Sequence, residues 1–416
     1  MSADGRGPAL GAEQLDDLLA GVEAADAEVA RAWPGPDDAR QPVQVLYVPV
    51  DQVRADTATA AGAEALRLLR DHAPDGRGLA GACGLELDDE LADRVHARVV
   101  AKLTHEPVED LRADAEDGYD PGGPHARDPD EERAHVTAAA AGMAHGVVDG
   151  WAPPFLGLRV RSFADGQARR SVDLLDRYLG TFLDVLAGGG VHDLPPGFTI
   201  TLPKIVAVAH VEAFVRVLAA LEATHGLPVG TLRFEAQVET PASVIGPDGE
   251  PVLRALRDAA DGRLRSVHIG VYDHSAALGL PPSAQRLDHP ALDWLRHLVQ
   301  HTFAGTEVRL SDGSSAVRPA DGSTEAVHAV WARHAADVRH SLRHGWGQGW
   351  DLHPSHLVSR YATVFADLLV DHDEVVARLA AWEAGEPYRG VLDEPATITA
   401  LRRQHRRAVD AGAVAP

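Results

Sequence analysis

Residues 232–239 read Leu-Arg-Phe-Glu-Ala-Gln-Val-Glu, and the fold prediction starts from the strand pattern of this stretch. Polar and apolar side chains alternate, so Glu235, Gln237 and Glu239 share one face of an expected strand. Charged residues are seldom buried without a partner. Because apolar helical patterns flank the stretch, we interpret it as a central strand whose polar face has a function, rather than as a solvated edge strand.

Seven further β-rich runs alternate with helical patterns along the chain. The eight expected strands span 43–50, 108–116, 155–162, 198–204, 232–239, 264–272, 306–310 and 350–353. Between them, apolar residues recur at helical spacing, for instance over 171–186 and 210–225. Eight strand–helix repeats predict an α/β fold, a (β/α)8 TIM barrel.

The predicted barrel occupies residues 43–370, between an N-terminal helical extension (1–42) and a C-terminal helical tail (371–416). In the extension, the apolar residues from Leu15 to Val22 predict one amphipathic helix, and Pro34–Asp38 is a helix-breaking link. The first connection, 51–107, is long enough for extra helices beside that of one repeat. No function follows from its sequence.

Composition excludes some classes of partner. The 416 residues include 39 Lys+Arg and 62 Asp+Glu, and 39 − 62 gives a net charge of −23. Nucleic acids and anionic membranes select clustered Lys and Arg, so we expect neither as a partner. We also find no membrane-spanning or secretory pattern. Cys83 is the only cysteine, which is typical of a protein in the reducing cytoplasm.

A polar residue closes most of the expected strands. These residues are Asp117, Arg159 or Arg161, Lys204, Glu239, Asp273 and His353. Most are separated by 34 to 45 residues, close to the length of one strand–helix repeat. The carboxyl ends of barrel strands meet at one mouth, where such enzymes place their active sites. We therefore expect these side chains to surround one cavity.

Two of these residues are candidate metal ligands. Glu239 and Asp273 are expected at equivalent depths on consecutive parallel strands, whose spacing of about 4.8 Å lets two carboxylates share one ion. Oxygen ligands with retained waters favour Mg²⁺ over Zn²⁺, which prefers His and Cys. Mn²⁺ is an acceptable substitute.

The remaining polar strand ends suggest substrate contacts and proton transfer. Arg159 and Arg161 lie two residues apart, so we expect both to point the same way and form a fork for a carboxylate or enolate oxygen. Glu116 and Asp117 are adjacent acids that can act in proton transfer or orient metal-bound water. Lys204 is one of only two lysines, and we favour an electrostatic contact over a Schiff-base nucleophile.

His297 and His301 have the spacing that places two imidazoles on one helical face. No Glu follows His297, so the zinc protease motif is absent, and we interpret the pair as surface histidines in preference to a zinc site. The sequence also contains no dinucleotide-binding or Walker glycine motif.

These residues lie in segments that resemble the citrate lyase β-subunit and malyl-CoA lyase superfamily, which includes metal-dependent hydroxy-dioate aldolases with phosphoenolpyruvate/pyruvate-type barrels. The segments are Ala115-Glu116-Asp117-Gly118, Leu158-Arg159-Val160-Arg161, Thr201-Leu202-Pro203-Lys204-Ile205, Gln237-Val238-Glu239-Thr240-Pro241, Gly270-Val271-Tyr272-Asp273 and Gly349-Trp350-Asp351-Leu352-His353-Pro354. Their order along the chain is more specific than any one of them. The resemblance covers about residues 43–370.

The resemblance implies that Glu239 and Asp273 bind Mg²⁺ and that Arg159 holds the carbonyl or enolate oxygen of the substrate. It further implies that Glu116 and Asp117 support metal-bound water. It also implies a homo-oligomer, a trimer or hexamer.

The chain departs from the family pattern at two places near the expected mouth. Arg161 replaces an Asn of the family, and an extra loop, 248–251, follows the first expected ligand. We expect Arg161 to read the distal group of the substrate, with Lys204 and His353 as further substrate contacts. Both departures leave the identity of the substrate open.

The function we expect is Mg²⁺-dependent carbon–carbon cleavage of the aldol or Claisen type, on a 2-oxo or 3-hydroxy acid or its CoA thioester. The alternatives are thioester hydrolysis on the same barrel and a metal-binding barrel without activity. The acidic composition favours a small substrate, while basic pairs such as Arg169-Arg170 leave CoA open.

Overall fold

Eight parallel strands form one sheet in the computed structural model, which describes residues 10–37, 39–120, 126–390 and 393–414. The strands are β1 (Gln44–Pro49), β2 (Asp110–Asp114), β3 (Phe155–Arg159), β4 (Phe198–Leu202), β5 (Phe234–Val238), β6 (Leu264–Ile269), β7 (Arg309–Ser311) and β8 (Gly349–Asp351). Their order is β7-β6-β5-β4-β3-β2-β1-β8, with parallel pairing throughout. This arrangement confirms the (β/α)8 barrel.

The barrel closes weakly between β7 and β8. Both strands are only three residues long, and they share no ladder. A single bridge joins Ser314 to Trp350, and the amide of Asp312 donates to the carbonyl of Gln348 at 2.9 Å. We call this junction the seam.

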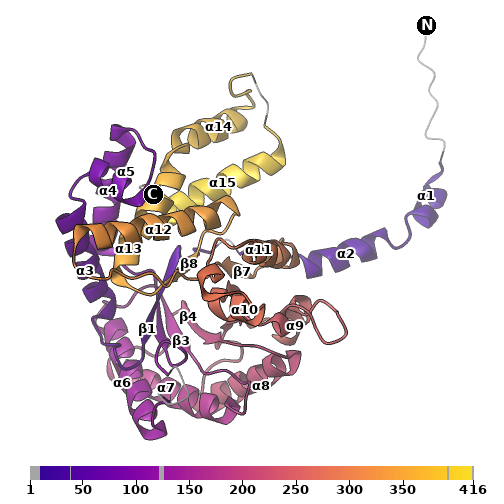
Figure 1. The fold of residues 1–416 in the computed structure, drawn as a ribbon. Helices are drawn as coiled ribbons and strands as arrows, with labels where there is room; N and C mark the ends of the chain where they lie inside the picture. Colours follow the sequence, from indigo (N-terminus) through magenta and orange to yellow (C-terminus); the bar gives the residue numbers. More distant parts are fainter. Residues whose placement is uncertain (1–9, 38, 121–125, 391–392, 415–416) are drawn as a thin grey trace.

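Helices surround the sheet and extend beyond it (Figure 1). They are α1 (Ala12–Leu18), α2 (Val22–Ala32), α3 (Thr57–His72), α4 (Gly76–Cys83), α5 (Asp89–His105), α6 (Pro129–Val148), α7 (Ala168–Gly188), α8 (Val208–His225), α9 (Leu253–Ala259), α10 (Val271–Ala277), α11 (Pro290–Phe303), α12 (Thr324–Arg343), α13 (Pro354–Leu369), α14 (His372–Ala384) and α15 (Pro395–Asp410). The long first connection holds α3, α4 and α5, which pack around α12 and α13. Nearly every residue of α13 is buried as a result.

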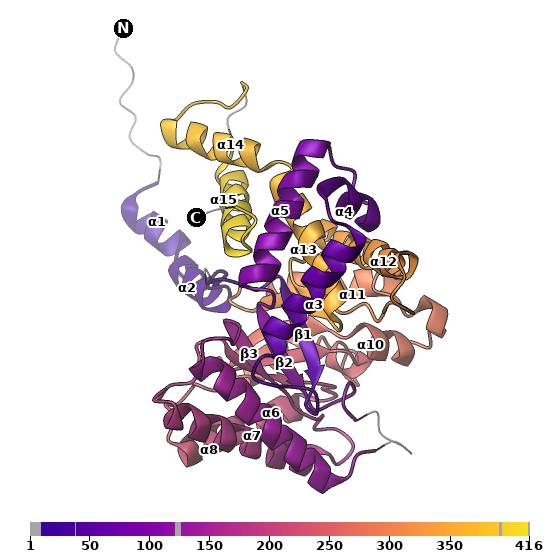
Figure 2. The ribbon, with the colours of Figure 1, turned by 90° about the vertical axis from the view of Figure 1, so that its left-hand side faces the viewer.

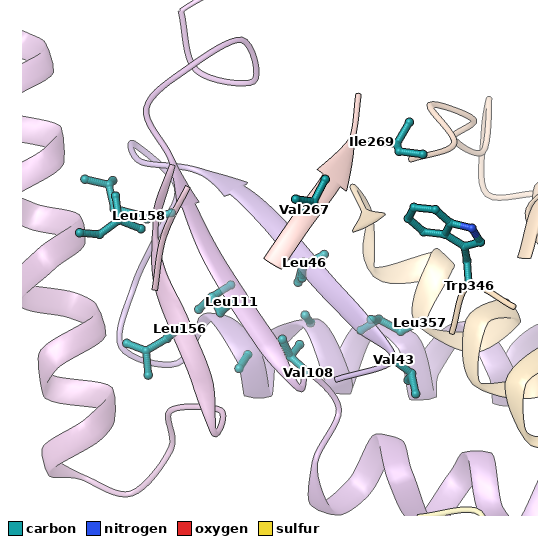
Figure 3. Close-up of a cluster of buried hydrophobic side chains, with 14 of the residues drawn as sticks. Val43, Leu46, Val108, Leu111, Leu156, Leu158, Val267, Ile269, Trp346 and Leu357 are labelled. Carbon is teal, nitrogen blue, oxygen red and sulfur yellow. The ribbon is translucent and has the colours of Figure 1, made fainter. Parts of the chain in front are cut away.

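The core lies between the strands and these helices. Leu111, Leu156 and Val267 are buried strand residues of one continuous apolar cluster, which Leu357 of α13 joins (Figure 3). Apolar residues alternate with polar ones along β4 and β5, so one face of these strands packs on helices and the other lines the barrel.

The barrel interior is polar and internally paired. Glu235 lies 3.3 Å from Arg112 and 3.1 Å from His268, and Trp350 donates from its indole nitrogen to His268 at 2.9 Å. Buried charges need such partners. The predicted polar face of β5 therefore lies inside the barrel. Glu235 on that face is paired with other barrel residues and has a structural place there.

The N-terminal segment differs from the single amphipathic helix predicted. Two helices, α1 and α2, are separated at Gly21, which has a φ of +92° that suits glycine. Both project away from the barrel (Figures 1 and 2), and the side chain of Leu18 remains 64% exposed. Residues 1–9 and Asp38 of the predicted extension lie outside the described residues. Among the residues that the structure describes, no helix has the length and apolar character to cross a membrane.

Candidate active site

A cavity of about 800 Å³ opens at the carboxyl ends of the strands. The residues that line it and bear on its chemistry are Tyr47, Asp114, Asp117, Arg159, Glu239, Asp273, Arg318 and His353. This volume is within the range of small-molecule sites. The structure thus brings most of the predicted strand-end residues together around one space.

Arg159 is fixed at the end of β3 by its neighbour on β2. Asp114 and Arg159 are register partners, and Nε and Nη2 of Arg159 donate to the two carboxylate oxygens of Asp114, each at 2.6 Å. The guanidinium also lies 5.0 Å from the ring centroid of Tyr47. Burial alone would lower the pKa of Arg159, but the charges of Asp114 and Glu116 raise it well above its ordinary value. Arg159 is therefore a rigid, permanently charged donor.

Glu239 follows β5 and is only 3% exposed. Its Oε1 accepts a hydrogen bond of 2.6 Å from the backbone amide of Lys204, whose φ of +48° directs that amide towards the carboxylate. Burial and the nearby charges of Glu116 and Asp273 raise the pKa of Glu239 to about 8. Gly270 packs so closely that a Cβ there would lie 2.3 Å from the Cβ of Glu239.

The side chain of Lys204 joins the acids around this carboxylate. Its Nζ lies 2.6 Å from both Glu116 Oε1 and Asp117 Oδ1, and 3.8 Å from Asp273 Oδ1. Burial would lower the pKa of Lys204, but these carboxylates raise it. A Schiff base requires the neutral amine, so this geometry supports the interpretation of Lys204 as an electrostatic contact.

The charges of the site do not balance. Its carboxylates are Asp114, Glu116, Asp117, Glu239 and Asp273, and its cations are Arg159, Lys204 and Arg318. When all are ionised, 3 − 5 leaves a charge of −2, and burial is the first cause that raises the pKa values of Glu116 and Asp273. A divalent cation would relieve this repulsion. The donors are all carboxylate oxygens, so the residues present fit Mg²⁺.

The strands expected to carry Glu116 and Asp273 both end earlier than predicted, which corrects the positions of these two acids. β6 ends at Ile269, and Asp273 lies in the first turn of α10, so the two expected ligands are not at equivalent depths on neighbouring strands. Val238 pairs with Ile269, which sets Glu239 opposite Gly270. Glu116 similarly lies in the loop after β2.

Arg161 does not share the direction of Arg159, so that prediction is wrong. β3 ends at Arg159, and the alternation of a strand no longer applies beyond it. The Arg161 side chain instead contacts Glu132 of α6 at 2.8 Å and Asp120 at 2.9 Å. It is not among the residues that line the cavity. Its contacts support a structural position beside α6.

His353 lines the seam side of the cavity as the N-cap of α13. Its Nδ1 accepts a hydrogen bond of 3.1 Å from the amide of Ser355. Burial and the charge of Arg318 lower the pKa of His353. The imidazole is therefore neutral at neutral pH and available as a polar contact for a ligand.

Three cavity residues were not predicted from the sequence: Tyr47, Asp114 and Arg318. Asp114 and Arg159 are each the last residue of a five-residue strand, and their opposite charges are the one signal that predicts a cross-strand pair. Tyr47 and Arg318 carry no such signal.

Comparisons with known proteins identify the family and the fold. A family model described as a domain of unknown function (DUF6986) matches residues 22–416, which is most of the chain. The chain belongs to the DUF6986 family. A search of curated proteins finds no significant match to this DUF6986 member.

Several solved structures of other proteins are similar to this DUF6986 protein. A citrate lyase from Burkholderia xenovorans LB400 is 19% identical, with 92% of this chain and 97% of that chain covered and a TM-score of 0.55. A malate synthase from Haloferax volcanii is 14% identical over 91% and 98% of the two chains, at a TM-score of 0.47. An HpcH/HpaI aldolase from Desulfitobacterium hafniense DCB-2 is 14% identical, with 62% of this chain and 80% of that chain covered and a TM-score of 0.33. The first of these likenesses shows that the fold is shared with a citrate lyase of low sequence identity.

Proposed function

We propose that this protein is a Mg²⁺-dependent carbon–carbon lyase of the aldol or Claisen type that acts on a 2-oxo or hydroxy acid. The observation that carries the proposal is the convergence of Arg159 and the buried carboxylate of Glu239 on one cavity at the strand ends. The likeness in fold to a citrate lyase supports it.

Glu239 and Asp273 are the residues that would hold the cation, with Mn²⁺ as a substitute. When bound, the cation would polarise an oxygen of the α-oxo acid or carboxylate. The unbalanced negative charge of the site and its all-oxygen donors support this assignment.

Arg159 would stabilise the enolate that cleavage leaves behind. A guanidinium has five N–H donors, and Asp114 accepts two of them. Three donors remain on Nη1 and Nη2, and Nη1 lies 3.4 Å from Oε2 of Glu116. An oxygen on which negative charge develops would accept from these donors. Because Asp114 and Tyr47 already hold the group, little reorganisation is needed as that charge forms.

Asp117 would accept the proton that cleavage releases. In aldol cleavage the hydroxyl of the substrate loses its proton, the carbon–carbon bond breaks, and its electron pair forms the enolate. Burial would raise the pKa of Asp117, but the hydrogen bonds and charge of Lys204 lower it below its ordinary value. Asp117 is therefore ionised at neutral pH, and it lines the cavity.

Product analysis tests the proposal. The purified protein with Mg²⁺ is incubated with a panel of hydroxy-oxo acids and hydroxyacyl-CoA thioesters, and products are identified by mass spectrometry. The lyase should release pyruvate, glyoxylate, oxaloacetate or an acyl-CoA, and Arg159→Met should suppress that release. Release of free CoA without carbon–carbon cleavage would establish the thioester hydrolase instead. Absence of any turnover across the panel would favour a metal-binding barrel without activity.

We also propose that the protein self-associates as a trimer or hexamer, since the family resemblance of the sequence implies these states and most soluble oligomers are symmetric homo-oligomers. Light scattering at micromolar concentration measures the assembly directly. A monomeric mass would remove this proposal without affecting the chemistry.

A further inference from the structure

Four metal-binding side chains meet on the outer surface of the barrel, away from the cavity. Asp293 and His297 lie one turn apart on α11, and His340 lies on α12 one turn before His344, the C-cap of that helix. None of the four lines the cavity. The two helices belong to consecutive strand–helix repeats, so the cluster joins segments about 45 residues apart in the sequence.

The distances within the cluster are those of ligands around one ion. The Nε2 atoms of His340 and His344 lie 2.7 Å and 3.5 Å from Oδ1 of Asp293. One ligand atom from each of these three residues lies within 4.8 Å of the other two. With bond lengths of about 2.0 to 2.2 Å, ligands of a tetrahedral Zn²⁺ are separated by roughly 3.3 Å. The observed distances bracket this value.

His297 lies behind this triad. Its Nε2 is 3.0 Å from Nδ1 of His344, the ring nitrogen that faces away from Asp293. Hydrogen bonding at Nδ1 sets which nitrogen of His344 carries the proton, so a proton shared there leaves the Nε2 lone pair of His344 available. Histidine ligands of zinc are commonly supported through their second nitrogen in this way.

We propose that Asp293, His340 and His344 form a Zn²⁺ site on the surface between α11 and α12, with His297 as its supporting residue. Two imidazoles and one carboxylate leave the fourth tetrahedral position for water. Because its ligands come from both helices, the ion connects α11 to α12 beside the seam. This site is independent of the proposed lyase activity.

The surroundings of the triad are compatible with a cation. Arg296 donates to Oδ1 of Asp293 at 2.6 Å, but a carboxylate has about four acceptor positions and can serve both partners.

A second cluster shows why this one is distinctive. His334, Asp351 and His356 also lie close together, but they are buried and already paired. Arg360 lies 2.7 Å from Asp351, and Nε2 of His356 is 2.7 Å from the carbonyl of Val317. Occupation by an ion would break these internal contacts, whereas the side chains of the surface triad are each 23% to 25% exposed.

The test is Zn²⁺ titration of the full chain. The protein is purified with an affinity tag that contains no histidine and is freed of metal before the titration. Excess Mg²⁺ occupies the cavity carboxylates, and competition with a chromophoric chelator measures affinity. We expect one Zn²⁺ per chain. His340→Ala and His344→Ala should each weaken the affinity by more than about 100-fold, and His297→Ala by about 10- to 100-fold, as loss of a supporting residue does.

His301→Ala is the matched control, because His301 lies on the same helix but its Nδ1 contacts only the carbonyl of His297. It should leave the affinity unchanged. Asp293→Asn keeps the size of the side chain and should also weaken binding, so a folding failure of one alanine variant leaves the test intact. If the His340, His344 and Asp293 variants all bound Zn²⁺ as tightly as the unmodified chain, the proposal would be overturned. Absence of Zn²⁺ binding by the unmodified chain would overturn it as well.

Discussion

The guanidinium of Arg159 and the carboxylate of Asp114 form two parallel hydrogen bonds across the β2–β3 register, each 2.6 Å long. Bidentate pairs of this kind fix orientation as well as charge. Asp114 thereby decides where the remaining donors of Arg159 point. Its contribution to turnover would act through Arg159.

The first prediction tests this dependence. Arg159→Met should lower kcat by about 10²- to 10³-fold through loss of a charge-stabilising donor. Asp114→Asn should lower kcat by about 10²-fold, because an amide cannot accept both hydrogen bonds and the guanidinium shifts. The double variant should be no slower than Arg159→Met alone. If steady-state kinetics showed that the kcat loss of the double variant equals the product of the two single losses, Asp114 would act independently of Arg159.

The second prediction concerns the expected metal ligands. Glu239→Gln and Asp273→Asn should each abolish Mg²⁺ binding in calorimetric titration while the circular dichroism spectrum is unchanged, since both acids line the cavity and lie outside the apolar core. Asp248→Asn is the control, because this exposed acid lies in the loop after Glu239. Unaltered Mg²⁺ titration in both ligand variants would refute the assignment.

The third prediction uses the packing of Gly270 against Glu239. Its φ of −93° is open to any residue, so Gly270→Ala adds only the methyl group. That methyl would lie 2.4 Å from Oε2 of Glu239 and must displace the carboxylate. We expect Mg²⁺ affinity to fall by at least about tenfold, as perturbing an outer partner of a ligand does. Wild-type affinity in Gly270→Ala would show that Glu239 does not need its observed position.

The fourth prediction is a pH dependence of the metal-free protein. The pKa of Glu239 rises from an ordinary 4.5 to about 8 on folding, so the folded state binds the extra proton between these values. Stability from this group is complete below pH 4.5 and is lost as pH rises through 8. Urea midpoints should therefore decline over that range, and less so in Glu239→Gln. Saturating Mg²⁺ should reverse the trend, since the cation competes with the proton.

The fifth prediction separates Arg161 from substrate selection. Arg161→Met would remove one ion-pair partner from the buried carboxylates of Glu132 and Asp120, which Arg170 also contacts. Loss of one member of such a buried network should cost about 3 kcal/mol in chemical denaturation. The ranking of acids in the substrate panel should be unchanged. If the ranking of acids changed while the stability did not, Arg161 would instead be a substrate contact.

Strand positions could be predicted from the sequence, because period-two alternation and the spacing of repeats are strong signals. Strand ends could not. Apolar residues such as Val160 and Val271 continue past the last ladder pair, so the sequence pattern extends β3 and β6 by several residues. That excess accounts for the incorrect direction expected of Arg161 and the incorrect depth expected of Asp273.

Side-chain partners were still harder to predict. The cluster around Lys204 depends on its φ of +48°, a backbone conformation that nothing in Leu-Pro-Lys-Ile signals. The cluster of His340 with Asp293 depends on how two helices face each other, and helical spacing within His297 and His301 indicates only a shared face. Local periodicity in the sequence determines which face of a helix or strand a side chain occupies. Tertiary packing determines which side chains of other elements it contacts.

The weak seam between β7 and β8 leaves one side of the barrel wall without the ladder that joins every other neighbouring pair of strands. Residues proposed for bond breaking follow β2 to β6, which are joined by continuous ladders. Arg318, Trp350 and His353 line the same cavity on the side of the seam. We expect substitutions beside the seam to alter which acids are admitted while the carboxylates stay in place.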